Sequence, residues 1–407
     1  MAIFLVALNM RMSVTGIGPL LDDIAESRGV SAATLGLLAS IPLIVWAIVC
    51  PITHDIAARL GIDRTITLAL VVLAAGTVWR SLSLSPADLW VGTVLIGAAL
   101  AVANVLMPAI VKRDFESRTA GVMGVYSGLI GASAAIGTAI ALPVARFRPG
   151  AAGGSSPALG WEAGLLAGGA IIPLALVVWV LVARASKRAA SASEPRSTTA
   201  SSTAPSTPAA PSTATRHGTR VWRDRTAWLL AIYMGAQSAT FYICATWIVP
   251  VLLTQSVPEM VAGAWVTVFH FGGMGGSLLA PVILRFDGRS LLQVLLPATG
   301  AVGFLGLVFA PSFGLLWMIV LGLGCGAGLS VTLTLIALRS RDTATASAVS
   351  GMSQAFGYLV AALGPVLFGL AHDLTGAWVL SLAVVLAAVS AQFVTGLMLR
   401  DGRLVRL

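Results

Sequence analysis

Arg11 stands within the first long apolar segment of the chain, where a charged group is costly. It lies eight residues into a helix expected over residues 3–24, about 12 Å along the axis at about 1.5 Å per residue. That depth is near the middle of an apolar layer about 30 Å thick. An arginine there usually faces a cavity or a partner, and its planar fork of donors suits a carboxylate or nitro group. Arg11 is therefore the main candidate for binding; the alternative is a structural arginine that bonds backbone carbonyls or extends to the surface of the layer.

A second group of polar and aromatic side chains falls at comparable depth in other apolar segments. Polar groups on different helices can share a site only if the helices close around a polar space, and aromatic faces can stack on a flat molecule. The alternatives are ordinary hydrogen bonds between helices, worth about 0.6 kcal/mol on average, or packing and interfacial anchoring by the rings. As a set, we expect them to line one cavity with Arg11. They are Asn104, Gln237, Tyr242, His270, Gln354 and Tyr358, with Tyr126 and Trp247 as further aromatic candidates.

Charged residues gather at the ends of the apolar segments. Ion pairs among them could close one end of a helical bundle; the alternative is that they only fix the orientation of the chain in a membrane. The two roles are compatible, so we keep these residues as candidate gating residues. They are Arg59, Arg64, Lys112, Arg113, Asp114, Arg285 and Arg289.

The composition predicts that lipid is the main solvent of this chain. Of 407 residues, 57% are hydrophobic and 10% are charged, whereas soluble domains carry about a quarter charged residues. The net charge of +9 comes from short basic clusters between apolar segments rather than from one basic face, which argues against nucleic-acid binding. The three cysteines lack the spacing of a metal or disulfide framework, and we expect neither a metal nor a cofactor.

Twelve apolar segments reach the roughly 20 residues that a spanning helix needs. We therefore predict an all-α membrane protein with twelve transmembrane helices in two pseudo-symmetric six-helix bundles. The first six helices are expected near 3–24, 33–54, 65–84, 88–110, 119–143 and 162–183. The last six are expected near 227–254, 260–284, 290–311, 313–337, 345–370 and 376–399.

A segment rich in Ser, Thr, Ala and Pro, Ser191–Thr215, separates the two sets of helices. Such a composition cannot bury a core and predicts disorder. We therefore divide the chain into an N-terminal bundle over 1–184, a disordered cytoplasmic linker over 185–225 and a C-terminal bundle over 226–407.

The distribution of Lys and Arg predicts the orientation. With the N-terminus in the cytoplasm, the 25 Lys and Arg residues fall in cytoplasmic segments except for Arg11, Arg28, Arg80, Arg146 and Arg148. This asymmetry is typical of a multi-pass protein of the bacterial inner membrane with both termini in the cytoplasm. Met1 leads directly into an apolar run without a basic region, so we expect no cleavable signal peptide, and the abrupt start is compatible with a start codon further upstream.

Several stretches resemble the major facilitator superfamily and, within it, the cyanate and 2-nitroimidazole permease family. They are ALNMRMSVTGIGPLLDDI at 7–24, VANVLMPAIVKRDF at 102–115, GAQSATFYICATW at 235–247 and SQAFGYLVAALGPVLFGLAHDLTGAW at 353–378. The last two stretches include Tyr242 and Tyr358. The chain departs from the pattern at Ala58, where the superfamily usually has an acidic residue, and at His270, where this family often has Gln.

The resemblance implies two bundles around a central cavity and a secondary transporter that moves a small anion or a compact azole by alternating access. Arg11 would be its main solute-binding group, and His270 is a candidate to carry a coupled proton, with a neutral hydrogen-bonding role as the alternative. We expect a monomer. A drug exporter of the same superfamily is the other transport hypothesis. The sequence has no Walker motif, HExxH or nucleophile elbow, which argues against a membrane enzyme, and the simple linker argues against a sensor with a folded output domain.

Overall fold

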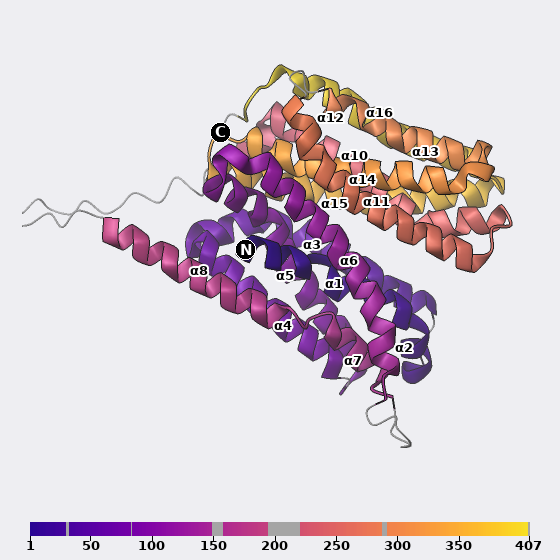
Figure 1. Cartoon of the computed structure of the whole chain (residues 1–407), viewed down its shortest axis with the longest axis horizontal. Helices are drawn as coiled ribbons and strands as arrows, with labels where there is room; N and C mark the ends of the chain where they lie inside the picture. Colours follow the sequence, from indigo (N-terminus) through magenta and orange to yellow (C-terminus); the bar gives the residue numbers. More distant parts are fainter. Residues whose placement is uncertain (30–31, 83, 149–157, 194–219, 287–290, 406–407) are drawn as a thin grey trace, which may run out of the picture.

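The computed structural model describes residues 1–29, 32–82, 84–148, 158–193, 220–286 and 291–405, and contains helices and no strand in these ranges (Figure 1). The first half contains α1 (Ala2–Thr15), α2 (Leu21–Arg28), α3 (Ala32–Leu60), α4 (Ile62–Leu82), α5 (Pro86–Asp114), α6 (Thr119–Arg146), α7 (Gly160–Ala167) and α8 (Ile172–Ser193). The second half contains α10 (Arg225–Thr254), α11 (Glu259–Phe286), α12 (Leu292–Leu295), α13 (Pro297–Phe309), α14 (Gly314–Leu338), α15 (Thr343–Thr375) and α16 (Trp378–Met398).

Twelve spans among the described residues are long and apolar enough to cross a membrane. This number confirms the predicted fold class, although three predicted helices are each built from more than one piece. The first, expected over 3–24, is divided: α1 ends at Thr15, and α2 begins at Leu21 after a 3-10 turn at Gly18–Leu20. The sixth span joins α7 to α8 through Gly168 and its neighbours, and the ninth joins α12 to α13 at Pro297. Proline has no backbone N–H to donate to the preceding turn, so a new helix begins at Pro297.

The connection between the halves differs from the expectation over part of its length. Helix α8 continues to Ser193, so helix covers the first residues of the segment 185–225. The second half begins with a short 3-10 turn at Val221–Arg223, followed by α10 at Arg225. Residues 194–219, which include most of the predicted linker, lie outside the described ranges.

The two halves lie side by side, and both chain ends are on the same side of the molecule, the left in Figure 1. We call this side the terminal end and the other side the opposite end. Because the spans cross in alternating directions, α5 ends and α6 begins at the terminal end, as α14 ends and α15 begins in the second half. Helices α3, α5 and α6 of the first half pack against α15, α14 and α11 of the second.

The apolar core is continuous between the halves only over part of their length. The largest cluster contains buried residues of both halves, among them Met107 and Tyr126 from the first and Ile336 and Met352 from the second. Two further clusters each belong to one half: one lies around Leu20 and Trp161, the other around Phe304 and Phe368. Leu20 and Phe368 lie toward the opposite end of their spans, so the halves are joined through the terminal side.

Candidate solute-binding site

Arg11 lies at the meeting of the two halves. Its backbone N–H donates to the Oγ of Ser133 on α6 over 3.2 Å. Its guanidinium is half-buried and donates from Nη1 to the hydroxyl of Tyr242 on α10 over 3.0 Å. Among the described residues no carboxylate forms an ion pair with Arg11. The charge of Arg11 is therefore held by a neutral acceptor from the other half.

Aromatic rings surround the guanidinium. Its central carbon lies 5.3 Å from the centre of the Trp46 ring and 5.9 Å from the centres of the Phe241 and Tyr242 rings. The Trp46 ring in turn packs on Tyr358 with 4.6 Å between centroids. A cation over an aromatic face gains about 0.5–2 kcal/mol, more as water is excluded. Four helices, α1, α3, α10 and α15, thus place one cation and four rings in a single layer.

The structure brings two of the other predicted residues to Arg11. Tyr242 is its hydrogen-bond partner, and Tyr358 packs against Trp46 beside it. His270, on α11, is half-buried; its ring lies 5.3 Å from that of Phe269, and it is within electrostatic range of Arg11. The structure gives no direct contact between His270 and Arg11.

Gln354 and Asn104 meet one another rather than Arg11. The Nε2 of Gln354 on α15 donates to the backbone carbonyl of Asn104 on α5 over 2.7 Å, and to the Oγ of Ser350 over 2.9 Å. The first bond joins the two halves. Gln354 lies one helical turn from Tyr358, on the terminal side of the aromatic layer. Asn104 contributes its backbone to this contact.

The side chain of Gln237 contacts its own half of the molecule rather than Arg11. Its Nε2 donates to the backbone carbonyl of Cys325 on α14 over 3.2 Å. It lies next to a small hollow within the second half, which Gln392 and Thr240 also line. The structure therefore does not bring Gln237 to Arg11.

Sequence reasoning missed Trp46, Phe241 and Ser133. Phe241 directly precedes Tyr242, and Trp46 lies near the middle of α3, Ala32–Leu60, so depth along the helix was an available signal for both. Ser133 supplies a hydroxyl to a backbone N–H, and nothing in its surrounding residues distinguishes it from other small residues that pack helices.

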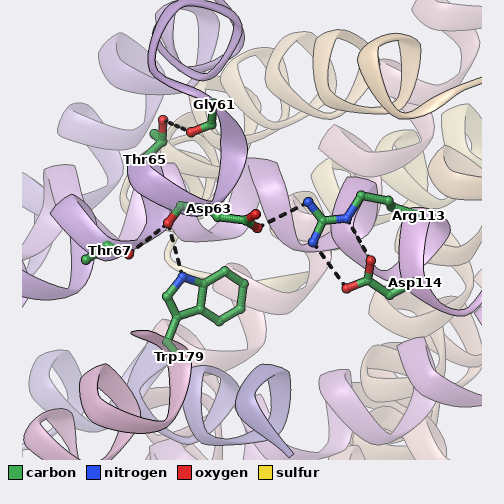
Figure 2. A network of polar contacts seen from close by, with 7 residues as sticks. All are labelled: Gly61, Asp63, Thr65, Thr67, Arg113, Asp114 and Trp179. Atoms are coloured by element: carbon green, nitrogen blue, oxygen red, sulfur yellow. Dashed lines mark hydrogen bonds and ion pairs between the residues drawn. The ribbon is translucent and has the colours of Figure 1, made fainter. Parts of the chain in front are cut away.

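Two candidate gating residues of the first half, Arg113 and Asp114, form a network with Asp63 at the terminal end (Figure 2). Arg113 donates to Asp63 over 3.1 Å and to Asp114 over 2.7 Å. The indole N–H of Trp179 on α8 donates to the backbone carbonyl of Asp63 over 3.2 Å. All these residues belong to the first half: the Arg113–Asp63 ion pair joins α5 to α4, and the Trp179 hydrogen bond joins α8 to α4. Neither contact crosses to the second half.

Two other gating candidates reach across the halves. The Nζ of Lys112 on α5 donates to the backbone carbonyl of Ala337 on α14 over 3.0 Å. Arg285 of α11 lies against Gly121 of α6, where Nη2 would be 3.9 Å from an added Cβ. Arg59 and Arg64 are exposed and form no ion pair with the described residues. Arg289 lies outside the described ranges.

The halves approach each other most closely on the terminal side of Arg11. A Cβ added to Gly124 of α6 would collide with the ring of Pro281 on α11, and one added to Gly351 of α15 would come 2.8 Å from the carbonyl oxygen of Cys50 on α3. Glycine at both positions lets the helix backbones touch. From the Arg11 layer to the terminal end, the described helices are therefore packed shut.

The Major Facilitator Superfamily profile matches residues 3–365 of the chain. The chain belongs to this superfamily. The 2-nitroimidazole transporter of Escherichia coli (strain K12) is 33% identical over 92% of this chain and 88% of the relative. The uncharacterized transporter YycB of Bacillus subtilis (strain 168) is 30% identical over 95% and 89%, and the cyanate transport protein CynX of Escherichia coli (strain K12) is 25% identical over 94% and 92%.

Solved structures confirm the fold. The proton:xylose symporter XylE, bound to 6-bromo-6-deoxy-D-glucose, superposes with a TM-score of 0.74 at 12% identity, covering 99% of this chain and 96% of that one. The transporter FucP in its outward conformation gives a TM-score of 0.70 at 12% identity, over 97% and 98%. The chain is thus a multi-pass membrane protein and a secondary transporter, and the resemblance found in the sequence is confirmed.

Proposed function

We propose that this protein moves a small anionic or azole-like solute across the cytoplasmic membrane by alternating access, with Arg11 as the main group that engages the solute. The observation that carries the proposal is the state of Arg11: it has no carboxylate partner among the described residues and is held by Tyr242 of the other half. A charge near the middle of a bilayer calls for a partner. A solute with a planar acceptor group would supply a partner for Arg11 that is present only while the solute is bound.

The surroundings of Arg11 favour a flat solute. Trp46, Phe241 and Tyr242 present ring faces to the guanidinium at 5.3–5.9 Å, and such faces stack well on a planar group. The names of the relatives agree with this class, since one is a 2-nitroimidazole transporter and another a cyanate transport protein. Both are compact molecules, as a site between closely packed helices requires.

The remaining parts of the proposal concern the membrane and the coupling. The basic clusters at the terminal end favour a cytoplasmic position for both termini in a bacterial inner membrane. In that orientation the structure is closed toward the cytoplasm. We propose a monomer, in which His270, half-buried and within electrostatic range of Arg11, is the candidate to carry a coupled proton.

Transport by protein reconstituted into liposomes tests the proposal. Wild-type protein should take up 2-nitroimidazole or cyanate above empty vesicles, and Arg11→Ala should abolish the uptake while the protein still inserts. Arg403→Ala is a matched control, because Arg403 is exposed at the terminal end and pairs with Asp401 over 2.9 Å. Uptake that Arg11→Ala leaves unchanged would contradict the role of Arg11. Binding of bulky cations, without binding of small anions or azoles, would favour the drug-exporter hypothesis instead.

A further inference from the structure

Two buried polar atoms beside Arg11 lack hydrogen-bond partners among the described residues. They are the indole nitrogen of Trp46 and the hydroxyl oxygen of Tyr126. Each side chain is 1% exposed. Burying such a group without a partner costs free energy, because the bond it made to water is lost. Most buried polar groups in proteins avoid that cost, so both atoms require an explanation.

Both side chains lie near Arg11: Trp46 is part of the aromatic layer, and Tyr126 lies on the terminal side of that layer. The centre of the Trp46 ring lies 5.3 Å from the guanidinium carbon of Arg11 and 4.6 Å from the centre of the Tyr358 ring. Tyr126 lies on α6 two helical turns before Ser133, and therefore on the same face as the hydroxyl that accepts the Arg11 backbone N–H. Tyr126 is also within electrostatic range of Arg11 and Tyr358. The two unpaired atoms thus come from two different helices, α3 and α6.

The same chemical groups are satisfied elsewhere in the chain. The hydroxyl of Tyr233 donates to the carbonyl of Gln293 over 2.9 Å. The indole N–H groups of Trp247 and Trp317 donate to backbone carbonyls, each over 2.9 Å. The fold therefore supplies acceptors for the donors of a buried tyrosine and of two half-buried tryptophans away from Arg11. The exceptions at Trp46 and Tyr126 coincide with the candidate site.

We propose that Trp46 and Tyr126 donate hydrogen bonds to the transported solute while Arg11 holds it, and that they make the site specific for a flat solute with several acceptor atoms. Arginine and tryptophan can only donate, and tyrosine can do so. No carboxylate among the described residues accepts from Arg11 in this layer. A solute with a nitro or carboxylate group, or a similar planar array of acceptors, matches three donors from three helices. A cation or a solute that mainly donates does not.

This inference rests on the proposed function and goes further by assigning specificity to two named atoms. The test uses purified full-length protein and two probes with the same ring, 2-nitroimidazole and imidazole, with cyanate as a third. The variants Tyr126→Phe and Trp46→Phe each keep an aromatic ring and remove one donor. Tyr233→Phe and Trp317→Phe are the matched controls, because they remove the same groups at positions where the donor already has a protein partner.

We expect each site variant to bind 2-nitroimidazole about tenfold more weakly than the wild type, as the loss of one hydrogen bond predicts. Binding of imidazole, which lacks the nitro oxygens, should change much less, so the preference between the two probes should shrink. The two control variants should keep the wild-type affinity and preference. Calorimetric titration measures all these constants.

The outcomes separate this inference from the proposed function. If the wild type binds 2-nitroimidazole or cyanate and both site variants bind it equally well, the specificity role is wrong and the proposed function stands. If the wild type binds none of the probes, the proposed function is overturned together with this inference. Tyr126→Phe removes one unpaired oxygen without changing the shape of the ring, so it decides the matter even if Trp46→Phe fails to fold.

Discussion

The side chain of Gln354 donates to the backbone carbonyl of Asn104 over 2.7 Å and so ties α15 to α5. This bond lies one helical turn to the terminal side of Tyr358, directly beneath the aromatic layer around Arg11. Gln354 is 1% exposed, so the bond is shielded from water. In a transporter that works by alternating access, these two helices belong to halves that must separate at the terminal end. The Gln354–Asn104 bond therefore stabilises the closed form.

Replacing Gln354 with Leu should shift the protein toward the form that is open at the terminal end. Loss of one buried hydrogen bond costs about 1 kcal/mol, or roughly a fivefold change in the equilibrium. Fluorophores at positions 118 and 341, exposed residues just before the starts of α6 and α15 at the terminal end, report the distance between the halves. Gln293→Leu is the control, because Gln293 donates to the Gly396 carbonyl over 2.9 Å within the second half. An unchanged distance distribution for Gln354→Leu would show that the bond does not govern closure.

The number and type of helices could be predicted from the sequence because the bilayer imposes a length of about 20 apolar residues on each span. The depth of Arg11 followed from the same rule, since the rise of a helix per residue is fixed. Tyr242 and Tyr358 were found through the family pattern, and the structure places both at Arg11.

The direction in which a side chain points could not be predicted in the same way. Gln237 and Tyr242 lie five residues apart on one helix and therefore on different faces of it. Gln237 bonds to Cys325 of its own half, and Tyr242 reaches Arg11. When a helix is apolar on every side, its sequence does not show which face meets the other half. For the same reason the sequence did not indicate that the ring of Trp46 faces Arg11.

Removing the hydroxyl of Tyr242 should destabilise the protein when no solute is bound. The variant Tyr242→Phe keeps the ring face but leaves the Nη1 of Arg11 without its acceptor, and a hydrogen bond to a charged group is worth about 1.5–3 kcal/mol. A bound solute would supply a replacement acceptor, so solute should raise the midpoint of thermal unfolding more in the variant than in the wild type. Equal shifts in both proteins would mean that the solute and Tyr242 do not share a donor.

Substitutions at the neighbouring residues Lys112 and Arg113 should have different effects on the equilibrium between the closed and open forms. Lys112→Met removes the bond to the Ala337 carbonyl across the halves, so it should increase the population that is open at the terminal end, by about two- to tenfold for one hydrogen bond. Arg113→Met removes ion pairs that stay within the first half, so it should lower thermal stability and leave the equilibrium between the two forms unchanged. The fluorophores described above measure both variants, and a larger shift with Arg113→Met would reverse this assignment.

Arg80 presents an unsatisfied charge away from the site. Its side chain is 1% exposed, none of its three guanidinium nitrogens has a hydrogen-bond partner among the described residues, and its backbone packs against Gly92 of α5. A buried charge without a partner costs several kcal/mol. Arg80→Met keeps the unbranched side chain and the backbone packing while removing the charge, and we expect it to raise the free energy of unfolding by about 2 kcal/mol. Arg403→Met, at an exposed ion pair, should change it by less than about 1 kcal/mol. Thermal and denaturant unfolding of both variants give the comparison, and a loss of stability in Arg80→Met would mean that the guanidinium is paired in the membrane.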